Sequence, residues 1–124
     1  MIVWILMWRW GETFITFATP RMEFVDIGQR LDSHANGLSV ALGDLDSDGY
    51  IDAVSGNEAD PVMVYLNDGN GHFMQKTQTQ CGVCTMPFIT KGIALGKLDQ
   101  DDSLDVFLAN KGDDFVWFND HFSG

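Results

Sequence analysis

The sequence has few basic residues. Seven Lys and Arg stand against 18 Asp and Glu in 124 residues, which gives a formal net charge of −11. Nucleic acids and anionic membrane surfaces are negatively charged and would repel such a chain. The charge balance therefore excludes these partners and favours metal ions or basic molecules.

Glutamate and helical patterns are also scarce. Only 3 of the 18 acidic residues are Glu and 15 are Asp, although exposed helices usually favour Glu. The chain has 13 Gly and many β-branched or aromatic residues, and no amphipathic pattern of helical period continues for more than a few residues. With 45% apolar residues, the chain can bury a core. We therefore expect one all-β domain over residues 1–124, with helices nearly absent.

Long hydrophobic runs are lacking, apart from the first ten residues, MIVWILMWRW. No positive charge precedes this run and no small-residue cleavage site closes it, so it does not have the form of a signal peptide. The run is also much shorter than the ~20 residues that span a bilayer. We interpret it as a strand and expect no membrane insertion; the compartment stays unknown.

The acidic residues concentrate in the stretch GDLDSDGYID, from Gly43 to Asp52. Its spacing, D-x-D-x-D-G-x-x-D, turns alternate side chains toward a common centre, and the glycine permits a sharp bend. Carboxylate-rich oxygen coordination suits Ca²⁺ better than Mg²⁺, and no His or Cys is placed there for zinc. The predicted calcium ligands are Asp44, Asp46, Asp48, Asp52 and the carbonyl of Tyr50. The alternative is an Asp-rich turn that only caps backbone amides.

A second copy of this stretch shows that the chain is a repeat. VALGDLDSDGYIDAV from Val40 aligns with IALGKLDQDDSLDVF from Ile93 at an offset of 93 − 40 = 53 residues. Asn57 then meets Asn110 and, after a one-residue deletion, VYLND meets VWFND. A period of this size indicates a repeated supersecondary unit that cannot bury its apolar face alone.

The second loop is a degenerate version of the first. Lys97 replaces the first aspartate, and Asp102 replaces the glycine. The remaining candidate ligands, which form a weaker metal site, are Asp99, Asp101, Ser103 and Asp105. We expect the Lys97 ammonium to act as a counter-ion for these acids, because loss of a charged ligand weakens a calcium site.

The sequence pattern of the repeat predicts a four-stranded antiparallel meander, which is the shape of a propeller blade. Apolar runs flank the acidic loop, and the DGNG turn supplies the positive φ angles that a tight hairpin needs. The N-terminal stretch TFITFATPRMEFVDIG predicts a third and a fourth strand around Pro20, with Phe24 in the place of Phe73. About two and a half blades result: a partial blade over 1–36, a complete blade over 37–80 and an incomplete blade over 90–124.

These motifs resemble a known family. GDLDSDGYID after an apolar strand, followed by VYLNDGNGHF, is similar to the FG-GAP or VCBS repeats of integrin-α-type β-propellers and bacterial surface proteins. The resemblance implies a calcium-stabilised propeller used for adhesion or ligand binding, often at the cell surface or outside the cell. It does not imply catalysis by the repeats.

Cys81 and Cys84 form a C-x-x-C motif in a connection four residues longer than its counterpart, since 93 − 73 = 20 whereas 40 − 24 = 16. They could be a redox pair, half of a zinc site or a disulfide that staples the loop. A loop insertion lacks the strand-then-helix context that activates such cysteines, which favours a structural staple or two ordinary thiols. The alternative function is therefore a redox or metal-dependent enzyme that uses CGVC or an intersubunit pocket.

The predicted blades are too few to close a propeller by themselves. Closed propellers have typically four to eight blades, and an isolated fragment would leave apolar faces and strand edges exposed. The chain is therefore either a piece of a longer protein or a unit that closes its ring by self-association. We favour the second alternative and expect a non-enzymatic binding, adhesion or scaffold module that closes a ring as a homo-oligomer and presents a site for a protein or carbohydrate ligand.

Overall fold

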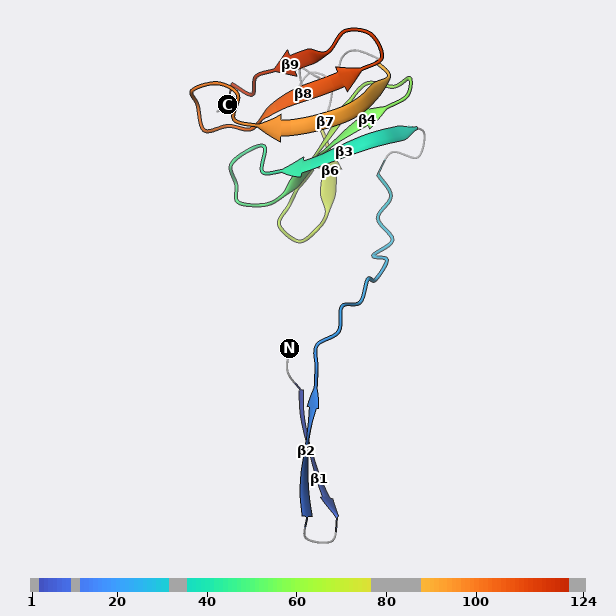
Figure 1. Ribbon diagram of the computed structural model, residues 1–124, viewed down its shortest axis with the longest axis vertical. Helices are drawn as coiled ribbons and strands as arrows, with labels where there is room; N and C mark the ends of the chain where they lie inside the picture. Colours follow the sequence, from blue (N-terminus) through green and yellow to red (C-terminus); the bar gives the residue numbers. More distant parts are fainter. Residues whose placement is uncertain (1–2, 10–11, 32–35, 77–87, 121–124) are drawn as a thin grey trace.

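The computed structural model describes residues 3–9, 12–31, 36–76 and 88–120, and these residues are all-β. Its first strands, β1 (Val3–Arg9) and β2 (Glu12–Ala18), form an antiparallel hairpin. Two further antiparallel sheets contain the acidic loops (Figure 1). No helix occurs in the described part of the chain, so none is present there that could span a membrane.

The first sheet is a four-stranded meander in the order β3-β4-β5-β6. Its strands are β3 (Gly37–Gly43), β4 (Asp52–Asn57), β5 (Met63–Asn67) and β6 (Phe73–Gln75). Each strand pairs with the next in sequence, as the short turns dictate. This sheet confirms the predicted blade-like topology.

The second sheet has three strands in the order β7-β8-β9. They are β7 (Thr90–Gly96), β8 (Asp105–Asn110) and β9 (Phe115–Trp117). The pairing repeats that of the first sheet: Gly96 lies opposite Asp105 as Gly43 lies opposite Asp52. The sequence offset therefore corresponds to a structural repeat.

The core lies between the two sheets, where β3 and β4 pack against β7. Its buried members are Leu45, Val54, Val62, Val106 and Leu108. Burial of each of these side chains stabilises the fold by roughly 1.5–3 kcal/mol. Gly43 allows the close approach of the sheets, because a Cβ there would lie 2.7 Å from Leu104 Cδ1.

A repeated asparagine shapes the turn after the second strand of each sheet. The Asn57 side chain donates to the Pro61 carbonyl at 2.8 Å, and the Asn110 side chain donates to the Asp113 carbonyl at 3.1 Å. These bonds satisfy turn carbonyls and explain why asparagine recurs at this repeat position.

The strand expected around Phe24 is not formed. Residues 19–31 run from the hairpin to the first sheet without strand pairing, and Phe24 is 91% exposed. An apolar segment becomes a strand only when a neighbouring strand accepts its hydrogen bonds, and no such neighbour faces this one among the described residues. The domain boundaries stay a prediction, and Cys81 and Cys84 lie outside the described residues.

Candidate metal-binding loops

The first acidic loop, residues 44–51, connects β3 to β4, and Asp52 opens β4. Each of the four predicted aspartate ligands offers one carboxylate oxygen, and these oxygens all lie within 4.8 Å of one another. They are Asp44, Asp46, Asp48 and Asp52. The structure thus brings the four predicted carboxylates together.

Backbone amides of the loop hold these carboxylates in place. Asp44 accepts hydrogen bonds from the N–H groups of Gly49, at 2.9 Å, and Asp48, at 3.2 Å. Asp48 in turn accepts from the N–H of Tyr50 at 2.9 Å. Gly49 has a φ of +88°, which an L-residue rarely adopts, so glycine allows the chain to reverse here. The loop is therefore curled by its own side chains.

Asp52 differs from the other three because its side chain is fully buried. Its Oδ2 accepts from the Leu45 N–H at 2.7 Å, and its Oδ1 accepts from the Asn67 N–H at 2.9 Å. These charge-assisted bonds connect the loop to the end of the third strand of the sheet. Each oxygen keeps a second lone pair that could face a cation.

The carboxylates repel one another in the absence of a cation. Burial, followed by the negative charge of Asp52, raises the pKa of Asp46 above its ordinary value. A bound cation would reverse the second of these effects by screening the charges from one another. All-oxygen coordination with three or four carboxylates is chemically suited to Ca²⁺.

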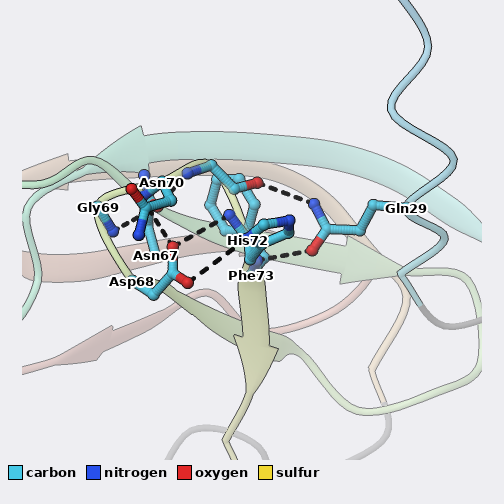
Figure 2. A network of polar contacts seen from close by, with 8 residues as sticks. Gln29, Asn67, Asp68, Gly69, Asn70, His72 and Phe73 are labelled. Atoms are coloured by element: carbon cyan, nitrogen blue, oxygen red, sulfur yellow. Dashed lines mark hydrogen bonds and ion pairs between the residues drawn. The ribbon is translucent and has the colours of Figure 1, made fainter.

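The DGNG turn, residues 68–71, supports the loop from the side. A Cβ at Gly69 would lie 2.6 Å from the Tyr50 ring, so the ring packs directly on the turn. The side chain of Asn67 accepts from the N–H groups of Gly69 and Gly71, at 3.0 and 3.2 Å (Figure 2). The N–H of Asn70 donates to Asp68 at 2.8 Å and lowers the pKa of that carboxyl.

The second acidic loop, residues 97–104, brings together three carboxylates. Oxygens of Asp99, Asp101 and Asp105 lie within 4.8 Å of one another. Asp105 is buried and accepts from the N–H groups of Leu98 and Asn119, at 2.7 and 2.9 Å, as Asp52 does in the first repeat. The buried aspartate therefore accepts the same two backbone hydrogen bonds in both repeats, although the second loop has three clustered carboxylates where the first has four.

Lys97 does not take the position that the sequence suggested. Its Nζ lies 3.2 Å from an oxygen of Asp102, and both side chains are exposed. The expectation that it neutralises Asp99, Asp101 and Asp105 is therefore corrected. Asp102 is nearer because it occupies the exposed bend where the first repeat has Gly49, and an exposed pair of this kind contributes little to stability. Ser103, another candidate ligand, is buried and donates its N–H to Asp101 at 2.8 Å.

Sequence reasoning missed the role of the repeated asparagine in VYLND and VWFND. Asn67 donates its side-chain amide to the Ile51 carbonyl at 3.0 Å. Asn119 donates to the Leu104 carbonyl at 3.2 Å and to the Leu45 carbonyl, in the other repeat, at 2.7 Å. The presence of this asparagine in both copies of the repeat is the feature of the sequence that could have revealed its role.

The repeat matches a known family model. The model of the FG-GAP-like repeat matches residues 44–108, just over half of the chain, from the first acidic loop into β8. Comparisons with curated proteins and with solved structures found no match. With its blade-like sheets and paired acidic loops, the chain belongs to the FG-GAP-like repeat family.

Proposed function

We propose that the protein is a calcium-stabilised β-propeller-type module whose first acidic loop binds one Ca²⁺. The observation that carries this proposal is the convergence of four aspartate oxygens within 4.8 Å in a loop of the FG-GAP-like repeat. Three of these aspartates approach from the loop and Asp52 from the strand, so they can surround an ion. The carbonyl of Tyr50 would complete the set.

Calcium fits this loop better than other common ions. Mg²⁺ demands near-ideal octahedral geometry and keeps several waters, whereas Ca²⁺ accepts a flexible shell rich in carboxylates. Zinc sites of proteins use mainly Cys and His, and neither residue occurs between Gly43 and Asp52.

The second acidic loop should bind calcium more weakly. It has three clustered carboxylates where the first loop has four, and the Lys97 ammonium lies at its border. Ligand charge is a main determinant of affinity in calcium loops. We infer that this loop serves mainly to fix the corner between β7 and β8.

The role proposed for the module is non-catalytic binding. A ring closed by self-association would present loops and a central channel to a protein or carbohydrate ligand. The family resemblance implies use in adhesion or as a scaffold at the cell surface or outside the cell. Calcium would then support the architecture, with the ligand bound elsewhere on the ring.

Thermal unfolding with and without calcium tests this proposal. At free calcium 100 times its Kd, one site stabilises the fold by about 2.7 kcal/mol, which raises the Tm of a domain this size by roughly 10 °C. We expect Asp46→Asn to remove this rise and Asp99→Asn, at the equivalent position of the second loop, to retain it. An unchanged Tm of the wild-type chain in calcium would refute the proposal.

A further inference from the structure

The two sheets use different faces for the contact between them. In the first sheet the face that carries Val54 on β4 and Leu45 packs against the second sheet. We call this face, and the face formed by the equivalent repeat positions of the second sheet, the front face. In the second sheet the opposite face, which carries Ile93 and Leu95 on β7, packs against the first sheet. We call this face, and the equivalent face of the first sheet, the rear face. Each sheet therefore has one face in the core, and it is not the same face in the two repeats.

The front face of the second sheet is apolar and exposed. Phe107 occupies the repeat position of Val54 and is 39% exposed, whereas Val54 is fully buried. Leu98 occupies the position of Leu45 and is 49% exposed, against 9% for Leu45. Exposed side chains on β9 and just after it continue the same face: Val116 and Phe118, the equivalents of Val64 and Leu66.

The rear face of the first sheet also carries exposed apolar side chains, on β3 and just before β4, although Ala53 and Tyr65 on the same face are buried. Leu42 occupies the repeat position of Leu95 and is 64% exposed. Val40 and Ile51, the equivalents of Ile93 and Leu104, are exposed beside it. A cavity lies on this face, with Val40, Ala53 and Tyr65 among its lining residues.

We propose that copies of the chain associate head to tail, the front face of the second sheet of one copy packing on the rear face of the first sheet of the next. This arrangement repeats between copies the contact that each copy already makes internally. It specifies the surfaces of the self-association proposed above and does not depend on calcium. Because each face meets a different face, the contact is heterologous and generates a ring or an open filament.

The exposed segment Met22–Ile27 fits the same arrangement. On the first sheet, β6 pairs with β5 with Phe73 opposite Asn67, and Lys76 N–H donates to the Val64 carbonyl at 2.8 Å. Among the described residues no strand occupies the equivalent edge of β9. Phe24 matches Phe73 in the repeat, so residues 22–27 of the next copy would add to β9 with Phe24 opposite Asn119.

Gln29 places this segment at the correct end of the molecule. Its side chain donates to the Gly71 carbonyl at 3.0 Å and accepts from the Phe73 N–H at 2.7 Å (Figure 2). Leu31, two residues later, lines the cavity on the rear face. The segment that precedes Gln29 therefore starts from the outer edge of the first sheet, beside the face that would receive the neighbouring copy.

The number of copies is limited by the number of blades in a closed ring. Propellers have typically four to eight blades, and the described residues of each copy form two sheets of the repeat. A ring closed by copies of this chain alone would therefore be a dimer, a trimer or a tetramer. The expected particle masses are small multiples of the 13.8 kDa chain.

Two complementary variants test the head-to-tail contact by sedimentation velocity at micromolar concentration, in calcium and in EDTA. Phe107→Glu damages the front face of the second sheet and Leu42→Glu the rear face of the first. We expect each variant alone to be monomeric, with its association Kd raised about thirtyfold or more. An equimolar mixture retains one intact contact per pair and should give a two-chain particle and nothing larger.

Met74→Glu is the matched control. Met74 is exposed on β6 and belongs to neither of the two faces of the proposed contact, and the substitution adds the same charge. It should assemble as the wild type does. A monomeric wild type would overturn the contact and the proposed self-association together. Oligomers that persist in Phe107→Glu or Leu42→Glu, or a mixture that stays monomeric, would overturn this contact alone. The calcium-dependent Tm is a separate readout, so failure of the metal proposal remains distinguishable.

The strand addition has its own test. Val25 is the repeat equivalent of Met74, which pairs with Leu66. Val25→Pro removes a backbone N–H from this segment, whereas Val25→Thr keeps it with a similar shape. We expect the proline variant to dissociate at concentrations where the threonine variant stays assembled. Equal association of the two variants would exclude pairing of this segment with β9.

Discussion

Replacing Asp52 with alanine should strongly destabilise the protein even without calcium. The carboxylate is fully buried and accepts hydrogen bonds from Leu45 N–H at 2.7 Å and Asn67 N–H at 2.9 Å. Its removal leaves two inward-facing donors without their partner, and each unsatisfied donor costs roughly 1–3 kcal/mol. Asp52→Ala should therefore lower the free energy of unfolding by about 2–6 kcal/mol.

Asp46→Ala is the informative comparison, because Asp46 belongs to the same loop but has a different environment. It accepts a long bond from the Asp48 N–H at 3.3 Å, and partial burial together with the charge of Asp52 raises its pKa. Its charged form is thus disfavoured in the folded state, so in EDTA the substitution should change stability by less than about 1 kcal/mol. The same substitution should abolish the stabilisation by calcium.

The assay for both variants is equilibrium urea denaturation in EDTA at one fixed protein concentration, followed by far-UV circular dichroism. If Asp52→Ala is too unstable to measure, Asp52→Asn keeps one acceptor oxygen and should cost about half as much. An Asp52→Ala variant within ~0.5 kcal/mol of wild type in EDTA would refute the structural role of this carboxylate.

Three further predictions follow from packing and charge. Leu108→Ala, at a fully buried core position, should cost about 2–5 kcal/mol in urea denaturation, and a loss below 1 kcal/mol would contradict the assigned core. Gly43→Ala should cost about 1–3 kcal/mol because its Cβ would meet Leu104 at 2.7 Å, whereas Gly96→Ala, with its nearest contact at 3.6 Å, should leave the monomer's Tm nearly unchanged. The Arg30 guanidinium, 2.8 Å from Asp26, lowers the pKa of that carboxyl, so Arg30→Gln should raise it toward the ordinary value in a ¹³C NMR titration; an unchanged titration would exclude the ion pair in solution.

The repeat made most of the fold predictable from sequence. The offset that aligns Val40 with Ile93 also aligns the pairs that the structure forms, because strand register follows the alternation of apolar side chains and the turn chemistry. The clustering of the four carboxylates was also predictable, because their spacing in a tight loop turns the alternate side chains toward a common centre. The carbonyl of Tyr50 as a ligand stays a prediction.

Features that depend on neighbours in space were not predictable. Val54 and Phe107 occupy one repeat position, yet the first is buried and the second exposed, because only the first faces the other sheet. Phe24 matches Phe73 in sequence but has no strand beside it. The burial of Asp52 and the pairing of Lys97 with Asp102 are likewise set by groups outside the motif.

Calcium binding measured directly by isothermal titration calorimetry tests the central claim most sharply. The proposal predicts one tight site per chain that is lost in Asp46→Asn and retained in Asp99→Asn. Any second event, from the loop with three carboxylates, should be weaker. Absence of calcium binding to the wild-type chain, or an unchanged tight site in Asp46→Asn, would contradict the assignment of the first acidic loop as the calcium site.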